Sequence, residues 1–332
     1  MSAKLTTWPS ISIALPVYNG ANYLREALDS VCSQTLKEFE VVISDNASTD
    51  KTPDICQEYT RRDSRIRVNR NDEFLQQSDN VNRAVDLCSA EWVKLFCHDD
   101  LMVPECMATI ERVVSNCGPR VGLIGNGEQW LFTNGYRYPQ ESDSTQPQFW
   151  PGQMLVRLRL AGRAAAPLPS LTTATVRKSA WQQSSKFDSR FVHFDSFLWL
   201  RLLVDWDYAY IPQILTVNRI HSRQVAASAR KTMRSVDDHR LFWHEFIRDC
   251  GNILRLNRRE KLMTRLRPLG SVGAALAIEV ICGNTRGAAA VFAKTPMVWW
   301  PVLPAFVLRS YRHEKRKIAS LVQRVPLREI YP

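Results

Sequence analysis

No run of 18 or more consecutive apolar residues occurs in this chain of 332 residues. A helix that crosses a bilayer needs about 20 such residues, so we expect no membrane-spanning helix. The nearest approach is the twelve-residue segment 297–308, which two prolines interrupt. The first ten residues also lack the apolar centre of a signal peptide, which predicts a cytoplasmic location.

Metal-binding cysteine spacings are missing as well. None of the eight cysteines forms a C-x-x-C pair or another spacing typical of zinc sites. In a chain of this size, such cysteines are expected to be reduced and buried as small hydrophobic residues. The pattern therefore argues against a zinc module and agrees with a cytoplasmic protein.

The composition is that of a globular protein with an excess of positive charge. Hydrophobic residues make up 45% of the chain and charged residues 23%, which argues against wholesale disorder. The formal net charge of +11 calls for an anionic partner: a nucleic acid, a phosphorylated substrate or an acidic membrane surface. We expect no nucleic acid, because no nucleic-acid-binding motif is present and the basic clusters lie near the C-terminus.

Segments with the apolar pattern of strands and of helices alternate over about the first 115 residues. Short apolar runs predict strands at residues 11–15, 39–43, 66–68 and 92–97. Apolar residues at helical spacing separate these runs. This alternation predicts an α/β protein with a doubly wound, mostly parallel sheet and helices on both faces.

The chain beyond this region is less regular. Residues 122–125 and 130–133 are predicted as two further strands, and residues 196–204 as a helix. Residues 134–170 are rich in Pro, Gln, Ser and Gly and are predicted as an irregular loop over the site. We place a catalytic domain at 8–228 and a basic, helical extension at 229–332.

Two polar loops follow the first two predicted strands. Tyr18 and Asn19 lie in the turn after residues 11–15, where an aromatic ring can stack on a base and backbone amides can face phosphate. A plain strand–helix turn is an equally weighted alternative. Asp45 and Asn46 follow the second strand and could accept the N3–H of a pyrimidine, although a helix cap is the safer interpretation of these two alone.

Two carboxylates, Asp99 and Asp100, directly follow the apolar run 92–97. Ligands bind at the carboxyl ends of strands in open parallel sheets. Magnesium and manganese sites there commonly combine one or two carboxylates with substrate phosphates. The pair therefore predicts a metal-dependent enzyme that acts on a phosphate-bearing donor.

A third acid, Asp195, lies in an aromatic stretch with Phe191, Phe194 and Phe197. Apolar surroundings raise the pKa of a carboxyl group, which suits a general base. The alternative, equally compatible with the spacing, is a cap for the helix predicted at 196–204. Spacing alone does not identify His221 as a ligand, since a single histidine is more often structural than a ligand.

Together these segments resemble the family 2 inverting glycosyltransferases, which have the GT-A fold. The resemblance covers residues 10–115 well and 185–225 more loosely. Its motifs are LPVYNG at 15–20, FEVVISDNASTD at 39–50, NVNRA at 80–84 and HDD at 98–100.

The resemblance implies roles for particular residues. Asp195 matches the catalytic base, and Asp99 and His221 match positions that hold Mn²⁺ or Mg²⁺ on the donor diphosphate. The implied nucleotide-sugar-binding residues are Pro16, Val17, Tyr18, Asn19, Asp45, Asn46, Asn82, His98 and Asp100. Cys97 stands where the family usually has the first acid of a D-x-D motif, which is a departure from the pattern.

The implied function is transfer of a sugar, with inversion, from a nucleotide-diphosphate donor to a hydroxyl of a glycan or lipid-linked acceptor, in cell-surface polysaccharide synthesis. The alternative is a catalytically silent protein that binds a nucleotide sugar or serves as a scaffold at the membrane. Basic clusters and two tryptophans around residues 297–308 fit a segment at the anionic inner face of the cell membrane. A helical hairpin packed on the catalytic domain or in an oligomer is an equally weighted alternative.

Overall fold

The computed structural model describes residues 10–139, 146–161, 163, 166–221, 234–258 and 260–261. Within these residues, no helix has both the length and the apolar content needed to cross a membrane. The predicted segment 297–308 and most of the proposed extension lie outside the described residues.

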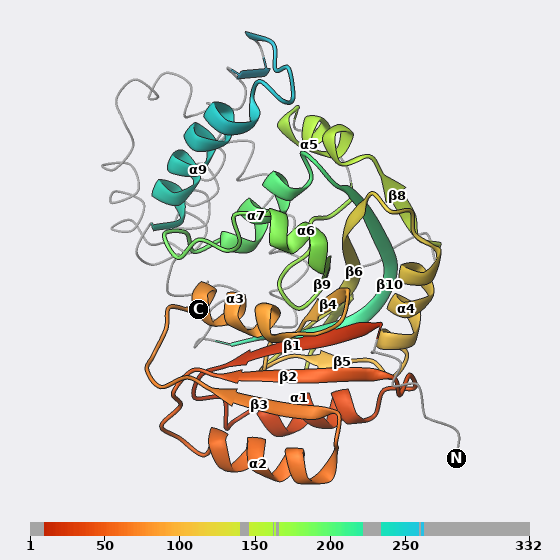
Figure 1. The fold of residues 1–332 in the computed structure, drawn as a ribbon, viewed down its shortest axis with the longest axis vertical. Helices are drawn as coiled ribbons and strands as arrows, with labels where there is room; N and C mark the ends of the chain where they lie inside the picture. Colours follow the sequence, from red (N-terminus) through yellow and green to blue (C-terminus); the bar gives the residue numbers. More distant parts are fainter. Residues whose placement is uncertain are drawn as a thin grey trace, which may run out of the picture.

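Helices and strands alternate along the N-terminal part of the chain, as predicted (Figure 1). The first eight elements are β1 (Ile11–Val17), α1 (Leu24–Cys32), β2 (Phe39–Asp45), α2 (Thr52–Arg62), β3 (Ile66–Arg70), α3 (Gln77–Leu87), β4 (Trp92–Leu95) and β5 (Leu101–Met102). The next elements are α4 (Cys106–Asn116), β6 (Val121–Phe132), β7 (Arg137–Pro139), β8 (Gln148–Trp150) and α5 (Gly152–Leu160). They are followed by β9 (Ala174–Arg177), α6 (Lys178–Gln183), α7 (Phe194–Leu202), β10 (Asp207–Ile220) and α9 (Arg234–Cys250).

The strands form a single sheet in the order β3-β2-β1-β4-β9-β6-β10-β5, with β7 and β8 paired to β6 and β10. The four strands from β3 to β4 are parallel, and so are β6 and β10. Between them, β9 runs antiparallel to both β4 and β6. The strand order reverses at β1, where crossovers lead to β2 on one side and β4 on the other. The carboxyl ends of β1 and β4 therefore lie next to each other, at the edge where a ligand is expected.

The sheet separates two apolar cores. On β1, Ile11, Ile13 and Leu15 face the core shared with α1, α2 and α4. Ala14 faces the opposite core, to which α3, α5, α6, α7 and α9 contribute. A strand buried on both faces is typical of parallel sheets covered by helices. The predicted α/β architecture with helices on both faces is therefore confirmed.

The structure corrects three expectations about the middle of the chain. Residues 134–170 are not a structureless loop, since the described part contains β7, β8 and the helix α5. The two strands expected at 122–125 and 130–133 form one long strand, β6, which pairs with β10 over most of its length. Helix α7 begins at Phe194, two residues before the predicted start, so Asp195 lies inside its first turn.

Helix α9 packs against the apolar core that contains α7. Phe242 stacks face to face on Phe197 of α7, with ring centroids 4.0 Å apart, and Phe246 is fully buried in the same core. Glu245 of α9 also accepts hydrogen bonds from Arg190 and Arg201. The predicted domain boundary at 228 falls outside the described residues and stays a prediction.

Candidate active site

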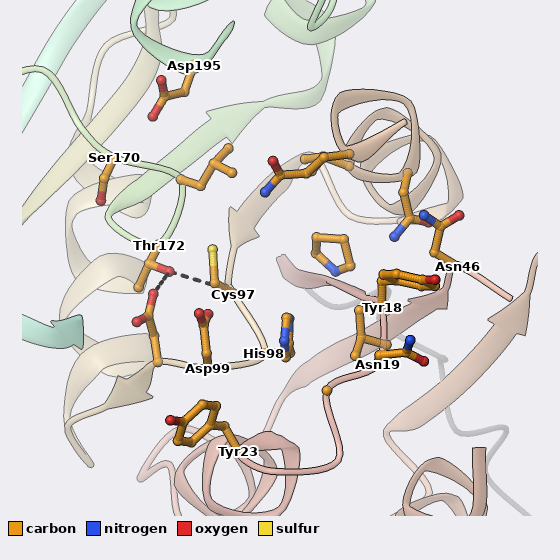
Figure 2. Close-up of a pocket in the computed structure, with 18 of the residues that line it drawn as sticks. Tyr18, Asn19, Tyr23, Asn46, Cys97, His98, Asp99, Ser170, Thr172 and Asp195 are labelled. Carbon is orange, nitrogen blue, oxygen red and sulfur yellow. Dashed lines mark hydrogen bonds between the residues drawn. The ribbon is translucent and has the colours of Figure 1, made fainter. Parts of the chain in front are cut away.

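A cavity of about 510 Å³ lies at the carboxyl ends of β1 and β4 (Figure 2). The turn after β1 and the end of β4 form one side of it. The segment 170–172 before β9 and the start of α7 form another. Of the predicted site residues, the cavity wall contains Pro16, Val17, Tyr18, Asn19, Asn46, His98, Asp99, Asp100, Asp195 and His221.

Two aromatic rings stand at the rim of the cavity. Tyr18 follows β1, and Phe74 lies in the loop before α3. Their ring centroids are 4.8 Å apart in an edge-to-face arrangement, and the side chains are 44% and 54% exposed. Exposed aromatic rings at the mouth of a cavity offer stacking surfaces for a planar base.

The turn after β1 is held in an unusual backbone conformation. Asn19 has φ = 47°, a left-handed value that asparagine tolerates better than most residues. Its backbone N–H donates to Ser48 Oγ at 2.9 Å, and its Oδ1 accepts from the backbone N–H of Thr49 at 2.8 Å. The side chain of Asn19 therefore fixes the turn to the loop after β2, and Tyr18 is presented toward the cavity.

Asp45 and Asn46 are engaged with the protein itself. Asp45 is buried, pairs with Arg70 and accepts from the backbone N–H of Ser48, and it does not line the cavity. Asn46 lines the cavity, but its Oδ1 already accepts from Asn71 Nδ2 at 3.0 Å and from a second, backbone donor. Neither residue caps α2, whose N-cap is Lys51. Both residues shape the loop next to Tyr18.

Asn82 does not reach the cavity. Its side chain donates to the carbonyl oxygen of Phe187 at 2.9 Å and accepts from the backbone N–H of the same residue at 3.0 Å. This pair of bonds joins α3 to the segment that leads into α7. The structure thus places Asn82 as a support for the α7 side of the cavity.

Three potential metal ligands gather at the end of β4. One ligand atom from each of Cys97, Asp99 and Asp100 lies within 4.8 Å of the other two. Asp99 forms a hydrogen bond with His221, which directly follows β10; the Oδ2 atom of Asp99 lies 3.0 Å from the Nε2 atom of His221. Asp100 is buried and accepts from the hydroxyl of Thr172 and from the backbone N–H of Arg219, the latter at 2.9 Å.

The two carboxylates differ in their titration. Burial works against ionisation of Asp99, but the hydrogen bond from His221 and the nearby His98 lower its pKa below the ordinary value. Burial and the charge of Asp99 raise the pKa of Asp100 well above its usual range. One anionic acid and one readily protonated acid therefore stand side by side at this strand end.

These residues fit a hard divalent cation. Carboxylate oxygens and an imidazole suit Mn²⁺ or Mg²⁺. The Nδ1 atom of His221 is buried and has no hydrogen-bond partner among the described residues. Burial raises the pKa of the Cys97 thiol, so Cys97 stays protonated and is a poor ligand. The candidate set is therefore Asp99, His221 and Asp100.

His98 packs tightly against the turn after β1. A Cβ atom added at Gly20 would lie 2.5 Å from Cδ2 of His98 and 2.6 Å from Cγ2 of Val17. Burial lowers the pKa of His98, so its ring is expected to be neutral near pH 7. The absence of a side chain at Gly20 lets the two strand ends approach each other at the floor of the cavity.

Asp195 faces the acidic centre from the other side of the cavity (Figure 2). Its Oδ1 accepts from the backbone N–H of Ser196 at 2.7 Å, and the N-cap of α7 is His193. Loss of hydration raises the pKa of Asp195 to about 6, although the bonds from Ser196 act in the opposite direction. A carboxylate with this pKa is suited to accept a proton near neutral pH.

Sequence reasoning missed the segment before β9 and one aromatic residue. Ser170, Leu171 and Thr172 line the cavity, and Phe74 stands beside Tyr18. The sequence around 170 contains no motif that points to a site. The only indication that Phe74 belongs to the site was its position shortly after the third predicted strand.

Comparison with known proteins identifies the N-terminal part of the chain. Residues 12–117 match the model of the family described as glycosyl transferase family 2. Over these residues the chain is similar to glycosyl transferase family 2. The matched segment includes Tyr18, Asp45 and the Asp99–Asp100 pair, so the predicted resemblance is confirmed.

Curated relatives are also glycosyltransferases. The chain is 24% identical over 266 residues to an uncharacterized glycosyltransferase of Rickettsia typhi, which covers 77% of this chain and 76% of that protein. It is 30% identical over 148 residues to chondroitin synthase of Escherichia coli, covering 42% of this chain but 21% of the relative. The prediction of a glycosyltransferase is confirmed at this level.

Solved structures share the fold. TarS of S. aureus in complex with UDP-GlcNAc has a TM-score of 0.58 and 17% identity, covering 91% of this chain and 89% of that one. The mannosyltransferase PcManGT from Pyrobaculum calidifontis, solved with GDP-Man and Mn²⁺, has a TM-score of 0.56 and 19% identity, covering 92% and 86%. The fold is of the GT-A type, as predicted.

Proposed function

We propose that this chain transfers a sugar, with inversion, from a nucleoside-diphosphate donor to a hydroxyl group of an acceptor. The observation that supports this most directly is that Asp195 and Asp99 lie on opposite sides of one cavity, which Asp100 also lines (Figure 2). A donor diphosphate at the acidic pair would direct its sugar toward Asp195. In this arrangement the acidic pair lies beside the leaving diphosphate, and Asp195 lies where it can take the proton of the acceptor hydroxyl.

The donor occupies the β1–β4 side of the cavity. Its base stacks on the exposed face of the Tyr18–Phe74 pair, and backbone amides of the turn after β1 face the phosphates. Similar folds are solved with UDP-GlcNAc in TarS and with GDP-Man in PcManGT. Both donors are nucleoside-diphosphate sugars, which supports this donor class for the present chain.

Asp99 and His221, with Asp100 beside them, would hold Mn²⁺ or Mg²⁺. A bound divalent cation supplies charge neutralisation on a departing diphosphate. The protein contributes the arrangement of the ligands: the hydrogen bond from His221 orients Asp99, and Thr172 orients Asp100.

Asp195 is the proposed general base. Its carboxylate takes the proton of the acceptor hydroxyl while the acceptor oxygen forms a bond to the anomeric carbon. The bond from that carbon to the diphosphate breaks on the opposite face, and the electron pair leaves with the diphosphate. The anomeric configuration of the product is therefore inverted.

The acceptor is proposed to be a glycan or lipid-linked hydroxyl in cell-surface polysaccharide synthesis. Similarity to chondroitin synthase over part of the chain supports a glycan acceptor. The basic clusters around residues 297–308 support binding at an anionic membrane surface. Co-sedimentation of the full chain and of residues 1–295 with vesicles that contain phosphatidylglycerol tests the membrane interaction. Equal binding by both would remove this part of the proposal.

The first experiment is calorimetric titration with UDP, dTDP, GDP and their sugars, in the presence of Mn²⁺, Mg²⁺ or EDTA. We expect one nucleotide to bind in a metal-dependent manner. NMR of the anomeric proton in the product then tests inversion. Donor binding without any turnover toward a panel of glycan acceptors would instead support a catalytically silent sugar-nucleotide-binding protein.

A further inference from the structure

A lysine is buried in the middle of the sheet beneath the candidate site. Lys94 belongs to β4 and has no exposed surface. Its neighbours two positions away on either side, Trp92 and Phe96, belong to the apolar core under α1 and α4. Burying an ammonium group is costly unless its charge is well hydrogen-bonded, so an apolar residue would be expected here on grounds of stability.

The ammonium group of Lys94 is directed at two oxygens. Nζ donates to the carbonyl oxygen of Thr172 at 2.6 Å and to Oδ1 of Asn126 at 2.8 Å. Within the described residues Lys94 forms no salt bridge, and Glu128 and Asp100 attract its charge only at longer range. Burial lowers the pKa of Lys94 to about 8, which leaves the group mostly charged at neutral pH.

Thr172 links this lysine to the acidic turn. The hydroxyl of Thr172 accepts from the backbone N–H of Cys97 at 3.1 Å and donates to Oδ2 of Asp100, as the dashed lines in Figure 2 indicate. Thr172 is buried and also lines the cavity. The carbonyl oxygen of Thr172 therefore accepts a hydrogen bond from Lys94, and the hydroxyl of the same residue fixes the 97–100 turn.

We propose that Lys94 is a positioning residue that acts through Thr172 to hold the turn containing Asp99 and Asp100 in its donor-binding geometry. This inference builds on the proposed function, because the turn is the proposed diphosphate and metal site. Groups that orient metal ligands typically change metal affinity or activity by about 10–100-fold when removed. The same contact fixes the segment 170–172, which lines the cavity together with Asp100 and Asp195.

The chain provides a matched control in Lys178. Its Nζ donates to three backbone carbonyls, those of Val85, Asp86 and Cys88, at 2.8 to 3.0 Å. It thus has the same chemistry as Lys94, an ammonium group on carbonyl oxygens, but does not line the cavity. A purely structural role for Lys94 predicts that Lys94→Met and Lys178→Met lower the Tm and leave the site unchanged.

The test uses two readouts on the full chain. The first is the Kd for Mn²⁺ alone, from the electron paramagnetic resonance signal of free Mn²⁺. We expect about tenfold weaker binding in Lys94→Met and Thr172→Val. We expect wild-type binding in Thr172→Ser, which keeps the hydroxyl, and in Lys178→Met. In the double variant Lys94→Met/Thr172→Val the losses are expected not to add, since both residues act through one link.

The second readout needs neither metal nor nucleotide. The rate of alkylation of Cys97 by iodoacetamide, followed on its peptide by mass spectrometry, is expected to rise about tenfold or more in Lys94→Met and Thr172→Val. Unchanged alkylation in both variants would overturn the inference. Failure of the wild-type chain to bind Mn²⁺ or any nucleotide would count against the proposed function, and the alkylation rates would still decide on Lys94. If Lys94→Met does not fold, unchanged alkylation in Thr172→Val by itself overturns the inference, because Lys94 is proposed to act on the turn only through Thr172, and Lys94→Gln then takes the place of Lys94→Met.

Discussion

His221 and Asp99 lie 122 positions apart in the sequence, yet 3.0 Å separates the Nε2 atom of one from the Oδ2 atom of the other. The ring of Tyr23 stacks on the imidazole, with centroids 5.1 Å apart, and keeps it in place. The bond joins the segment after β10 to the segment after β4, two strands that β9 and β6 separate in the sheet, and both segments meet at the candidate metal site.

Removing this imidazole should weaken metal binding. We expect His221→Ala to raise the Kd for Mn²⁺ about tenfold or more, because Asp99 loses its orienting partner and the site loses a nitrogen ligand. His244→Ala is the matched control, since His244 is exposed on α9. Isothermal titration with Mn²⁺ measures both. An unchanged Kd in His221→Ala would remove His221 from the metal site.

Replacing the proposed base should abolish transfer and spare donor binding. We expect Asp195→Asn to lower kcat by about 10²–10⁴-fold, the usual contribution of general-base catalysis. The Kd for the nucleotide is expected to stay within about twofold, because Asp195 lies on the acceptor side of the cavity. Asp205→Asn, on an exposed acid just after α7, is the control. Near-normal turnover by Asp195→Asn would show that another group takes the proton.

The raised pKa of Asp195 sets the direction of the pH dependence. The base must be ionised, so kcat/KM should fall as the pH drops through about 6 and level off above it. Stability changes with pH in the opposite direction. Because the pKa of Asp195 in the folded state exceeds the ordinary 3.8, ionisation of this carboxyl lowers the free energy of unfolding as the pH rises, and the loss is complete above about pH 6. Asp195→Asn should therefore be more stable at pH 7, by about 1–3 kcal/mol.

Urea unfolding at several pH values checks this effect. The difference in unfolding free energy between Asp195→Asn and the wild type should narrow as the pH falls from about 6 to 4, where the wild-type carboxyl becomes protonated. A difference that stays constant over this range would mean that the hydration of Asp195 is not lost on folding.

A methyl group at Gly20 should disturb the floor of the cavity. The new Cβ would lie within 2.6 Å of both His98 and Val17, so one of the strand ends must shift. Overpacking of this kind typically costs about 1–3 kcal/mol. We expect Gly20→Ala to lower the Tm and to weaken nucleotide binding. Gly118→Ala is the control, because no atom lies within 4 Å of the Cβ added there.

The aromatic pair at the rim should contribute to nucleotide affinity. Stacking of a base on an aromatic side chain is typically worth about 1–3 kcal/mol. We therefore expect Tyr18→Ala and Phe74→Ala each to raise the Kd for the bound nucleotide about fivefold or more, and Tyr18→Phe to bind normally. Phe149→Ala, on a ring as exposed as Phe74 but away from the cavity, is the control. Equal affinities would place the base elsewhere.

Local sequence patterns were sufficient for the N-terminal half of the fold. The apolar runs that become β1, β2 and β4 are short and bounded by turn residues, so both their type and their order could be predicted. Of the polar residues at their ends, Tyr18, Asn46 and Asp99 line one cavity, because parallel strands bring their carboxyl ends to one edge, whereas Asp45 does not.

Long-range pairing was beyond such patterns. In the sheet, β9 lies between β4 and β6, although in the sequence only β5 and α4 come between β4 and β6, and β9 follows all of them. Nothing local to Thr172 indicates that its hydroxyl reaches Asp100. The role of Asn82 was missed for a similar reason, since its partner, Phe187, lies 105 positions away.

The stacking of Phe242 on Phe197 has a consequence for how such a chain can be recombined. Phe197 is on the helix that holds Asp195, and Phe242 comes from α9, beyond the core strands of the sheet. A chimera that takes residues up to 221 from this protein and the following helix from a relative would place a foreign ring, or none, against α7. The two helices should therefore be exchanged as a pair, because the helix that holds Asp195 packs on the helix that follows the sheet.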